Sequence, residues 1–76
     1  MNLFKAPMNR EFIIDSVVIK GKEQRRLFDL GILPGSKIKK VFKSIFNDPI
    51  AYEVKKTTIA LRNEDAYLIE VKEENE

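Results

Sequence analysis

The chain has 76 residues and a formal net charge of +2, with 14 Lys and Arg residues against 12 Asp and Glu residues. This length allows one domain with one small core, too small to enclose a large catalytic pocket. The absence of Cys and His excludes disulfides, zinc fingers, iron–sulfur clusters, thiol nucleophiles and imidazole acid–base chemistry. Because no apolar run approaches the roughly 20 residues of a membrane span and the N-terminus lacks the apolar core of a signal peptide, we expect a soluble, cytoplasmic protein without membrane insertion.

The first strand is predicted over residues 12–19, FIIDSVVI, where apolar side chains fall on both faces. We therefore expect much of both faces to be buried. Residues 23–30 predict a helix of two turns, in which Leu27 and Leu30 share a face and Glu23 lies near the positive end of the helix dipole. A helix this short depends on packing against the rest of the domain.

The segment RLFDLGILPGSKI, residues 26–38, joins the helix end to a reversal and a strand start. Gly31 can take the left-handed conformation that closes a helix, and Pro34-Gly35 fits the two centre positions of a type II turn. Several apolar residues around the helix end and the turn are predicted to be core: Leu27, Leu30, Ile32 and Leu33. Gly31, Pro34 and Gly35 are predicted to be structural, and no nucleophile lies among them.

A long strand is predicted over residues 36–46, although its apolar period slips. A bulge or strong bend near Lys39-Lys40 would reconcile the two phases. The sequence Asn-Asp-Pro at residues 47–49 ends this strand. This break separates the long strand from a second group of strands.

Residues 50–54 alternate cleanly between apolar and polar positions, as a half-buried strand does. Lys55-Lys56 makes a tight connection to residues 57–61, which predicts a β-hairpin that ends at Leu61. The next segment, 63–66, predicts a turn or a single helical turn. The last strand is predicted from the alternating apolar residues Tyr67, Ile69 and Val71. Residues 72–76 are predicted to form a frayed acidic tail.

Five or six short strands with one short α-helix predict a mostly β protein. A flat two-layer sandwich of this length would lack sufficient core, whereas curling into a barrel fills the interior and removes the open edges. The predicted fold is a small SH3-like β-barrel, as a single domain over residues 1–76.

The charge is distributed unevenly along the chain. Between residues 20 and 43 eight basic residues face only Glu23 and Asp29, whereas the C-terminal end is acidic. A basic surface can meet nucleic acid, anionic lipid head groups or an acidic protein partner, and charge alone does not choose among them. The simplest interpretation is a solvated face.

Three segments resemble one known family, the FeoA domains of bacterial ferrous iron transport. The segment RLFDLGILPGSKI resembles the opening of the family's core, and DPIAYEV (48–54) and IALRNEDAYLIEV (59–71) resemble its later strands. The resemblance covers nearly the whole chain, in the family's order and spacing. Two positions depart from it: Asn47 and Lys56 stand where the family often has Gly, and Lys56 would be strained if the turn needs a positive φ.

The resemblance implies a non-enzymatic accessory and regulatory protein of ferrous iron transport. It implies docking on the cytoplasmic side of the FeoB membrane transporter, which has its own GTPase domain, and so a peripheral location at the inner face of the cell membrane through that partner. The resemblance supplies no catalytic residue, and from the residues themselves we assign no metal ligand and no cofactor. We expect a monomer or a weak homo-oligomer.

For docking we favour the helix and its flanks, because Arg and aromatic residues are over-represented at binding hot spots. The loop after the long strand is a second candidate. The predicted partner-binding residues are Lys22, Arg25, Arg26, Phe28, Asp29, Phe46 and Pro49. Arg62 is predicted to be a structural ion-pair partner of Glu64 or Asp65.

Two alternatives stay open. FeoA-like barrels also form the C-terminal domain of metal-dependent repressors of the diphtheria-toxin type, so the chain could be a stand-alone regulator module, although it contains no DNA-reading segment. It could also bind nucleic acid through the basic run and aromatic residues such as Phe42, Phe46 and Tyr52. We do not expect this, because the basic residues are not regularly interleaved with aromatics. The acidic pairs are interpreted as surface charge rather than metal ligands.

Overall fold

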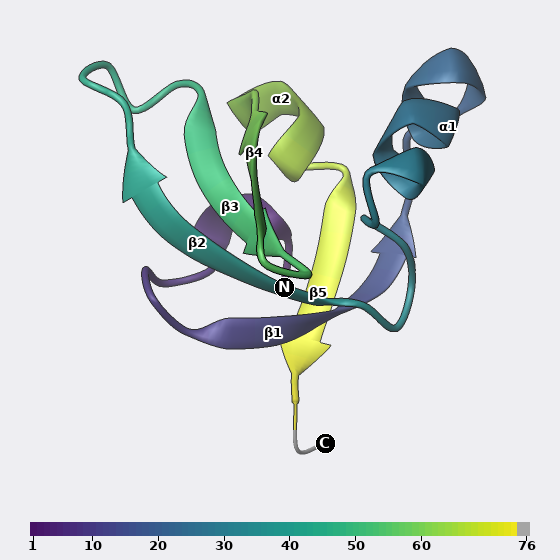
Figure 1. Cartoon of the computed structure of the whole chain (residues 1–76), viewed down its shortest axis with the longest axis horizontal. Coiled ribbons are helices and arrows are strands. Elements are labelled where there is room, and N and C mark those ends of the chain that lie inside the picture. Colours follow the sequence, from purple (N-terminus) through teal and green to yellow (C-terminus); the bar gives the residue numbers. More distant parts are fainter. Residues whose placement is uncertain (75–76) are drawn as a thin grey trace.

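The computed structural model describes residues 1–74 and consists mainly of one antiparallel sheet (Figure 1). The strands are ordered β4-β3-β2-β1-β5, and β1, which lies between β2 and β5, is followed along the chain by the helix α1. The elements in chain order are η1 (Leu3–Lys5), β1 (Glu11–Val17), α1 (Gly21–Asp29), β2 (Lys37–Lys43), β3 (Ile50–Val54), β4 (Thr57–Leu61), α2 (Asn63–Ala66) and β5 (Ile69–Glu73). The predicted mostly β fold with one short helix and a further single helical turn is confirmed.

The sheet bends strongly but does not close. In the described residues β4 and β5 are its two edges and do not pair with each other, whereas the sequence analysis expected a barrel without open edges. The 3-10 helix η1 lies against α2 and β5, and its Leu3 is fully buried. Because β4 and β5 do not pair to close the sheet, the N-terminal segment supplies part of the core instead.

Strand β1 is shorter and more one-sided than predicted. It ends at Val17 instead of continuing to Ile19, and Phe12 and Ile14 are the buried residues of the strand. The opposite face is only half covered, because a single bent sheet buries its inner face against the core and leaves its outer face near solvent. The expectation of burial on both faces was wrong.

Gly31 closes α1 in a left-handed conformation, as predicted, although the helix ends at Asp29 rather than Leu30. Gly31 has a φ of 98°, its N–H donates to the Phe28 carbonyl at 3.0 Å, and the Ile32 N–H donates to the Leu27 carbonyl at 2.9 Å. This pair of bonds is a Schellman motif, and the apolar contact that often accompanies it joins the buried Leu27 and Ile32. Leu30, predicted to be core, is instead 39% exposed, because the helix stops before turning it inward.

A type II turn follows, as predicted from Pro34-Gly35. The Ser36 N–H donates to the Leu33 carbonyl at 3.0 Å, and Gly35 has a φ of 94°. The Gly35 N–H also donates to the Ile14 carbonyl at 2.8 Å, which holds the turn against β1. The turn thus directs the chain into β2 beside β1.

Strand β2 contains the expected irregularity. Its register with β3 shifts between Lys40 and Phe42, next to the predicted Lys39-Lys40. The strand ends at Lys43 rather than at residue 46. The shift leaves Lys40 buried and Phe42 exposed, the reverse of what their side chains alone would favour.

The β3–β4 hairpin matches its predicted bounds, and Lys55 and Lys56 form its tight turn with φ values of 52° and 67°. Asn47, the other non-glycine departure, also has a positive φ of 61°. Both substitutions for Gly therefore occupy left-handed positions, which Asn tolerates better than Lys.

Strand β5 continues further than predicted. Lys72 and Glu73 pair with Ile13 and Phe12 of β1, although the sequence analysis placed them in a frayed tail. The antiparallel partner explains the difference, because β1 supplies hydrogen bonds that no local pattern reveals. Residues 75 and 76 of the predicted tail lie outside the described residues.

Candidate partner-binding surfaces

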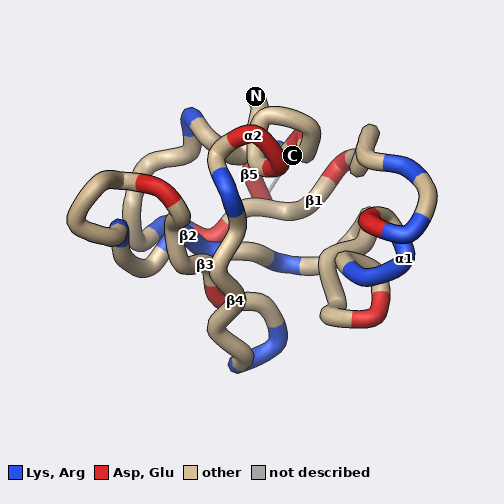
Figure 2. The backbone as a smooth tube through the Cα atoms, turned by 90° about the horizontal axis from the view of Figure 1, so that it is seen from above, with Lys and Arg blue, Asp and Glu red and all other residues tan. Residues whose placement is uncertain are grey.

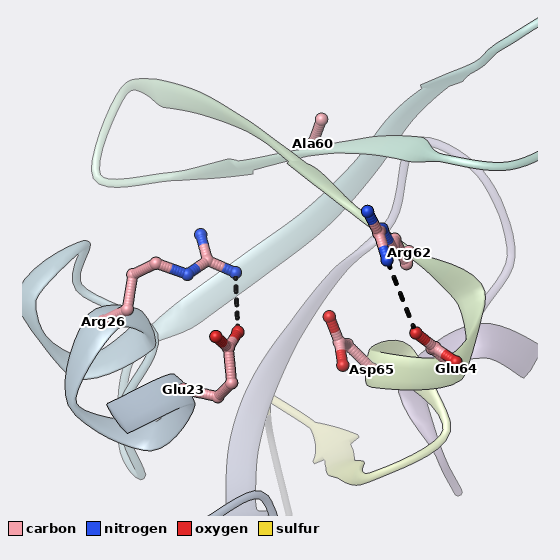
Figure 3. A pocket seen from close by; sticks show the side chains of 6 residues that line it. All are labelled: Glu23, Arg26, Ala60, Arg62, Glu64 and Asp65. Atoms are coloured by element: carbon pink, nitrogen blue, oxygen red, sulfur yellow. Dashed lines mark hydrogen bonds and ion pairs between the residues drawn. The ribbon is translucent and has the colours of Figure 1, made fainter. Parts of the chain in front are cut away.

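A mixed-charge cleft separates α1 from the end of β4 and α2 (Figure 3). It has a volume of about 430 Å³. One wall comes from α1 and the other from the β4–α2 junction, so the cleft exists only because the sheet carries these two elements to the same side. Its lining residues are Glu23, Arg26, Ala60, Arg62, Glu64 and Asp65.

Each wall presents a guanidinium that is loosely held by a carboxylate. Arg26 Nη2 lies 3.3 Å from Glu23 Oε2, and Arg62 Nη1 lies 3.8 Å from Glu64 Oε1 (Figure 3). All four side chains are more than half exposed. Exposed pairs of this kind contribute about 0 to 1 kcal/mol, so a partner's carboxylates or guanidinium groups can replace either member at little cost. Arg62 pairs with Glu64, one of the two carboxylates expected for it, and its structural role stays a prediction.

The remaining predicted residues of α1 do not line the cleft that Arg26 lines. Lys22, Arg25, Phe28 and Asp29 border a shallow hollow outside the cleft. Phe28 is half-buried there, which is compatible both with an anchor and with a packing role. The structure therefore divides the predicted docking residues of the helix between two surfaces.

The other predicted docking residues, Phe46 and Pro49, lie far from α1. Both are exposed in the loop between β2 and β3, which extends from the opposite end of the molecule (Figures 1 and 2). Phe46 is 86% exposed and its neighbour Ile45 is 91% exposed. The predicted docking residues of α1 and of this loop therefore lie at opposite ends of the molecule.

Sequence reasoning missed the burial of Lys40. Its Nζ donates to the Phe4 carbonyl at 2.7 Å and lies 5.6 Å from the centre of the Phe4 ring. Burial and the charge of Lys43 lower the pKa of Lys40. Its position two residues after the inward-facing Ile38 was the available signal, since alternate residues of a strand share a face. Lys40 thus fastens the N-terminal segment to β2 and does not belong to a basic surface.

One further finding bears on the nucleic-acid alternative. Tyr52, considered as a base-stacking aromatic, is fully buried. Within residues 1–74 no group of three or more acidic side chains is placed to hold a metal ion, and no helix there is long and apolar enough to cross a bilayer.

An open, strongly bent antiparallel sheet with one short helix defines a small SH3-like domain. FeoA of Stenotrophomonas maltophilia, solved with zinc and described as a prokaryotic SH3 domain protein, is similar to this chain with a TM-score of 0.80 and 28% identity, over 95% of this chain and 89% of that one. The predicted fold class is confirmed, with the sheet open rather than closed.

The FeoA domain family model matches residues 1–73. The chain belongs to the FeoA family, as its sequence segments indicated. Iron(II) transport protein A of Clostridium thermocellum is similar with a TM-score of 0.91 and 28% identity, over 99% of this chain, which spans only 46% of that longer chain. T. acidophilum IdeR, at 20% identity and a TM-score of 0.81 over 97% of this chain and 34% of that one, shares the fold alone. No curated protein matches the chain.

Proposed function

We propose that this protein is a cytoplasmic accessory protein of ferrous iron transport that docks on a FeoB-type membrane transporter and acts on its GTPase domain or its assembly. The observation that carries the proposal is the FeoA family match, which extends over residues 1–73. The proposal assigns binding and no catalytic step to this chain. Its location at the inner face of the membrane would follow from its partner.

The two surfaces of α1 support docking by complementary charge. The cleft offers Arg26 and Arg62 from opposite walls, each paired only with an exposed carboxylate. The outer side offers Lys22 and Arg25 beside Phe28. Arg residues near an apolar side chain are typical of binding hot spots, and exposed charges also accelerate encounter with a partner of opposite sign.

The test is a pull-down from detergent-solubilised membranes that contain a FeoB-type transporter, using the wild type and the variants Arg25→Glu and Arg26→Glu. We expect the wild type to recover the transporter and one or both variants to recover at least tenfold less. Loss with Arg26→Glu alone would identify the cleft, and loss with Arg25→Glu alone would identify the outer side of α1. The matched control is Lys56→Glu, an exposed charge reversal in the β3–β4 hairpin.

Recovery of the transporter by all variants equally would retain the partner and remove α1 as the docking surface. Failure of the wild type to recover the transporter would overturn the proposed function. Recovery of nucleic acid without the transporter would favour the alternative that the basic residues bind nucleic acid. If phosphate contacts dominate, this nucleic-acid binding should be lost at high salt.

A further inference from the structure

Strand β4 is an edge of the sheet, and its outward backbone groups have no partner among residues 1–74. It is joined to β3 through a two-residue turn, and in such a hairpin the residues beside the turn form a hydrogen-bonded pair. Thr57, Ile59 and Leu61 therefore bond to β3, and by alternation the N–H and C=O groups of Thr58 and Ala60 point away from the sheet. These outward groups are the template that an added strand requires.

The opposite edge of the sheet, β5, is covered by the chain's own N-terminal residues. The Met1 ammonium donates to the Val71 carbonyl at 3.1 Å, and the Val71 N–H donates to the Met1 carbonyl at 2.8 Å. Asn2 forms an antiparallel bridge to Glu70. A short segment thus pairs with β5, whereas within the described part of the chain no segment pairs with the outer side of β4.

Strand β4 also lacks the features that keep a free edge from pairing. Natural edge strands are protected by charged side chains, Pro or a bulge. The strand reads TTIAL, without a charge or Pro, and its register with β3 is regular, whereas the β2–β3 and β1–β5 pairings both contain a shift. Thr and Ile also favour strands. The edge is therefore suited to accept one more strand.

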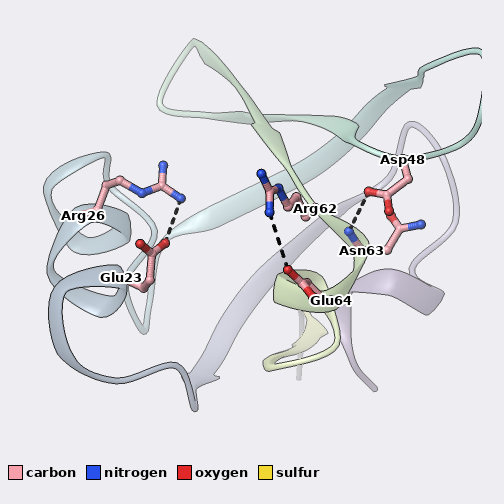
Figure 4. Close-up of polar contacts among 6 residues, drawn as sticks. All are labelled: Glu23, Arg26, Asp48, Arg62, Asn63 and Glu64. Carbon is pink, nitrogen blue, oxygen red and sulfur yellow. Dashed lines mark hydrogen bonds and ion pairs between the residues drawn. The ribbon is translucent and has the colours of Figure 1, made fainter.

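The cleft between α1 and α2 supplies space beside this edge. Ala60 lines the cleft, and Arg62 continues the chain along its wall (Figure 3). By the usual strand and sheet spacings one strand residue occupies about 160 Å³, so the cleft volume of about 430 Å³ holds roughly three residues of an extended segment. The wall is fixed by Asn63, whose N–H donates to Asp48 Oδ1 at 3.0 Å and whose side chain donates to the Asn47 carbonyl at 2.8 Å (Figure 4).

The charges of the cleft favour a basic occupant. Its lining contains three carboxylates and two guanidinium groups. Arg26 pairs with Glu23 and Arg62 pairs with Glu64, but Asp65 has no ion-pair partner within residues 1–74. Figure 3 shows the Asp65 carboxylate directed into the space between the two pairs. A Lys or Arg side chain of the occupant would supply the positive charge that Asp65 lacks.

We propose that β4 and this cleft bind an extended segment of a partner protein as an added strand, with its backbone on Thr58 and Ala60 and a basic side chain on Asp65. In this mode of recognition backbone hydrogen bonds give affinity and side-chain contacts give specificity. The inference deepens the proposed function, because it rests on the docking role of the cleft and names the form and charge of the segment that docks.

A second copy of this chain is a less suitable occupant. Thr58 of one copy can bond to Ala60 of the other only in one two-fold antiparallel register, which is centred on Ile59. That register sets Lys56 opposite the second copy's Arg62, and like charges in this position are destabilising. In addition, α1 forms the far wall of the cleft, where the rest of a second sheet would have to lie (Figure 3).

The test follows backbone amides of the full chain by NMR, with the capped synthetic peptide TVKVT as the probe. In the free protein we expect fast hydrogen exchange at the Thr58 and Ala60 amides and slow exchange at the Ile59 amide. The probe should shift the Thr58 and Ala60 resonances and slow their exchange at least tenfold. Two isomers of the peptide, N-methylated on alternate residues, provide a matched pair: the isomer methylated on the side that faces β4 should bind at least tenfold more weakly than the other.

Two variants test the protein side of the contact. Ala60→Pro removes an outward N–H and keeps the β3 ladder, since Pro is tolerated where the N–H of an edge strand faces solvent, and it should bind the probe at least tenfold more weakly. Asp65→Lys should bind TVKVT severalfold more weakly and should prefer the peptide TVEVT. The matched control is Asp15→Lys, an exposed carboxylate of β1 outside the cleft, which should bind as the wild type does. Circular dichroism will verify that each variant is folded, and the methylated peptides need no variant.

Unshifted Thr58 and Ala60 amides, equal binding of the two methylated isomers, or equal binding by folded Ala60→Pro would each overturn the inference. Dimerisation that requires the β4 edge, without peptide binding, would also overturn it and assign the edge to a second copy. The test contains no transporter, so its failure is distinct from failure of the proposed function. Transporter capture without peptide binding would overturn the added strand alone, whereas peptide binding without transporter capture would support the strand and overturn the proposed partner.

Discussion

The phenol of Tyr52 lies inside the core, and its hydroxyl has no hydrogen-bond partner among residues 1–74. Burial raises the pKa of Tyr52 to about 12, from an ordinary value of 10.0. A buried hydroxyl without a partner loses its hydration and gains no compensating bond, so it costs free energy at neutral pH. Lys40 is the contrasting case, because its buried amine donates to the Phe4 carbonyl.

We expect Tyr52→Phe to raise the free energy of unfolding by up to about 1 kcal/mol at pH 7, since it removes an unpaired hydroxyl with little change of volume. The raised pKa predicts a second effect. The unfolded chain releases the phenolic proton above pH 10.0 and the folded chain only near pH 12, so wild-type stability falls as the pH rises through this window, by roughly 2 to 3 kcal/mol.

Urea unfolding at pH 7 and pH 11.5 measures both effects of Tyr52→Phe. The variant should lose less stability between the two pH values than the wild type, and the matched control Tyr67→Phe, at a half-exposed ring, should behave as the wild type does. An identical alkaline loss in Tyr52→Phe and the wild type would contradict the assignment.

At the scale of elements, the β3–β4 hairpin is strained, because its turn contains two lysines where Asn and Gly are favoured. Lys55 and Lys56 both have positive φ, which is the geometry of a type I′ turn and favours Asn and Gly. Lys55 also contacts the region of Gly31, because a Cβ placed on Gly31 would meet Lys55 Cδ at 3.4 Å. Lys56 is therefore the better position for relieving the strain.

The variant Lys56→Gly should raise the free energy of unfolding by roughly 0.5 to 1 kcal/mol, because Gly adopts a positive φ without steric cost. Lys56→Ala keeps the Cβ and should give no gain, which separates backbone strain from loss of the charge. Thermal unfolding of both variants measures the difference. Equal melting temperatures for the Gly and Ala variants would show that the turn is not strained at this position.

At the scale of the whole molecule, the N-terminal segment completes the core. The Met1 ammonium donates to the Val71 carbonyl at 3.1 Å, and Leu3 is fully buried against the core. Lys40 binds the Phe4 carbonyl from the other side, and the Phe4 and Tyr67 rings stack at 4.5 Å. The N-terminal segment thus covers part of the core that the open sheet would otherwise expose.

Leu3→Ala should therefore lower the free energy of unfolding by about 2 to 5 kcal/mol, the cost of a cavity in a core. The matched control is Ile45→Ala, which deletes a similar volume at a residue that is 91% exposed and should change stability by less than about 0.5 kcal/mol. Denaturant titration of the two variants tests the comparison. A Leu3→Ala variant as stable as Ile45→Ala would show that the N-terminal segment contributes nothing to the core.

The sequence by itself determined the features that depend on neighbouring residues. Gly31 closes α1, Pro34-Gly35 makes the next turn, and the β3–β4 hairpin begins and ends where alternation and the lysine pair placed it. Backbone conformation and side-chain period act over a few residues, so a local pattern contains the necessary information. The ordered family segments likewise sufficed for the FeoA assignment.

Only the tertiary structure decided which side chains lie inside and which surfaces meet. The β2 register shift and the N-terminal segment bury Lys40, the contacts of Asn63 turn Ile45 and Phe46 outward, and pairing with β1 extends β5 through Glu73. The cleft between α1 and α2 also joins residues distant in sequence. The physical reason is that burial and pairing depend on partners brought together by folding, whereas local propensity describes only the residues beside each other in the chain.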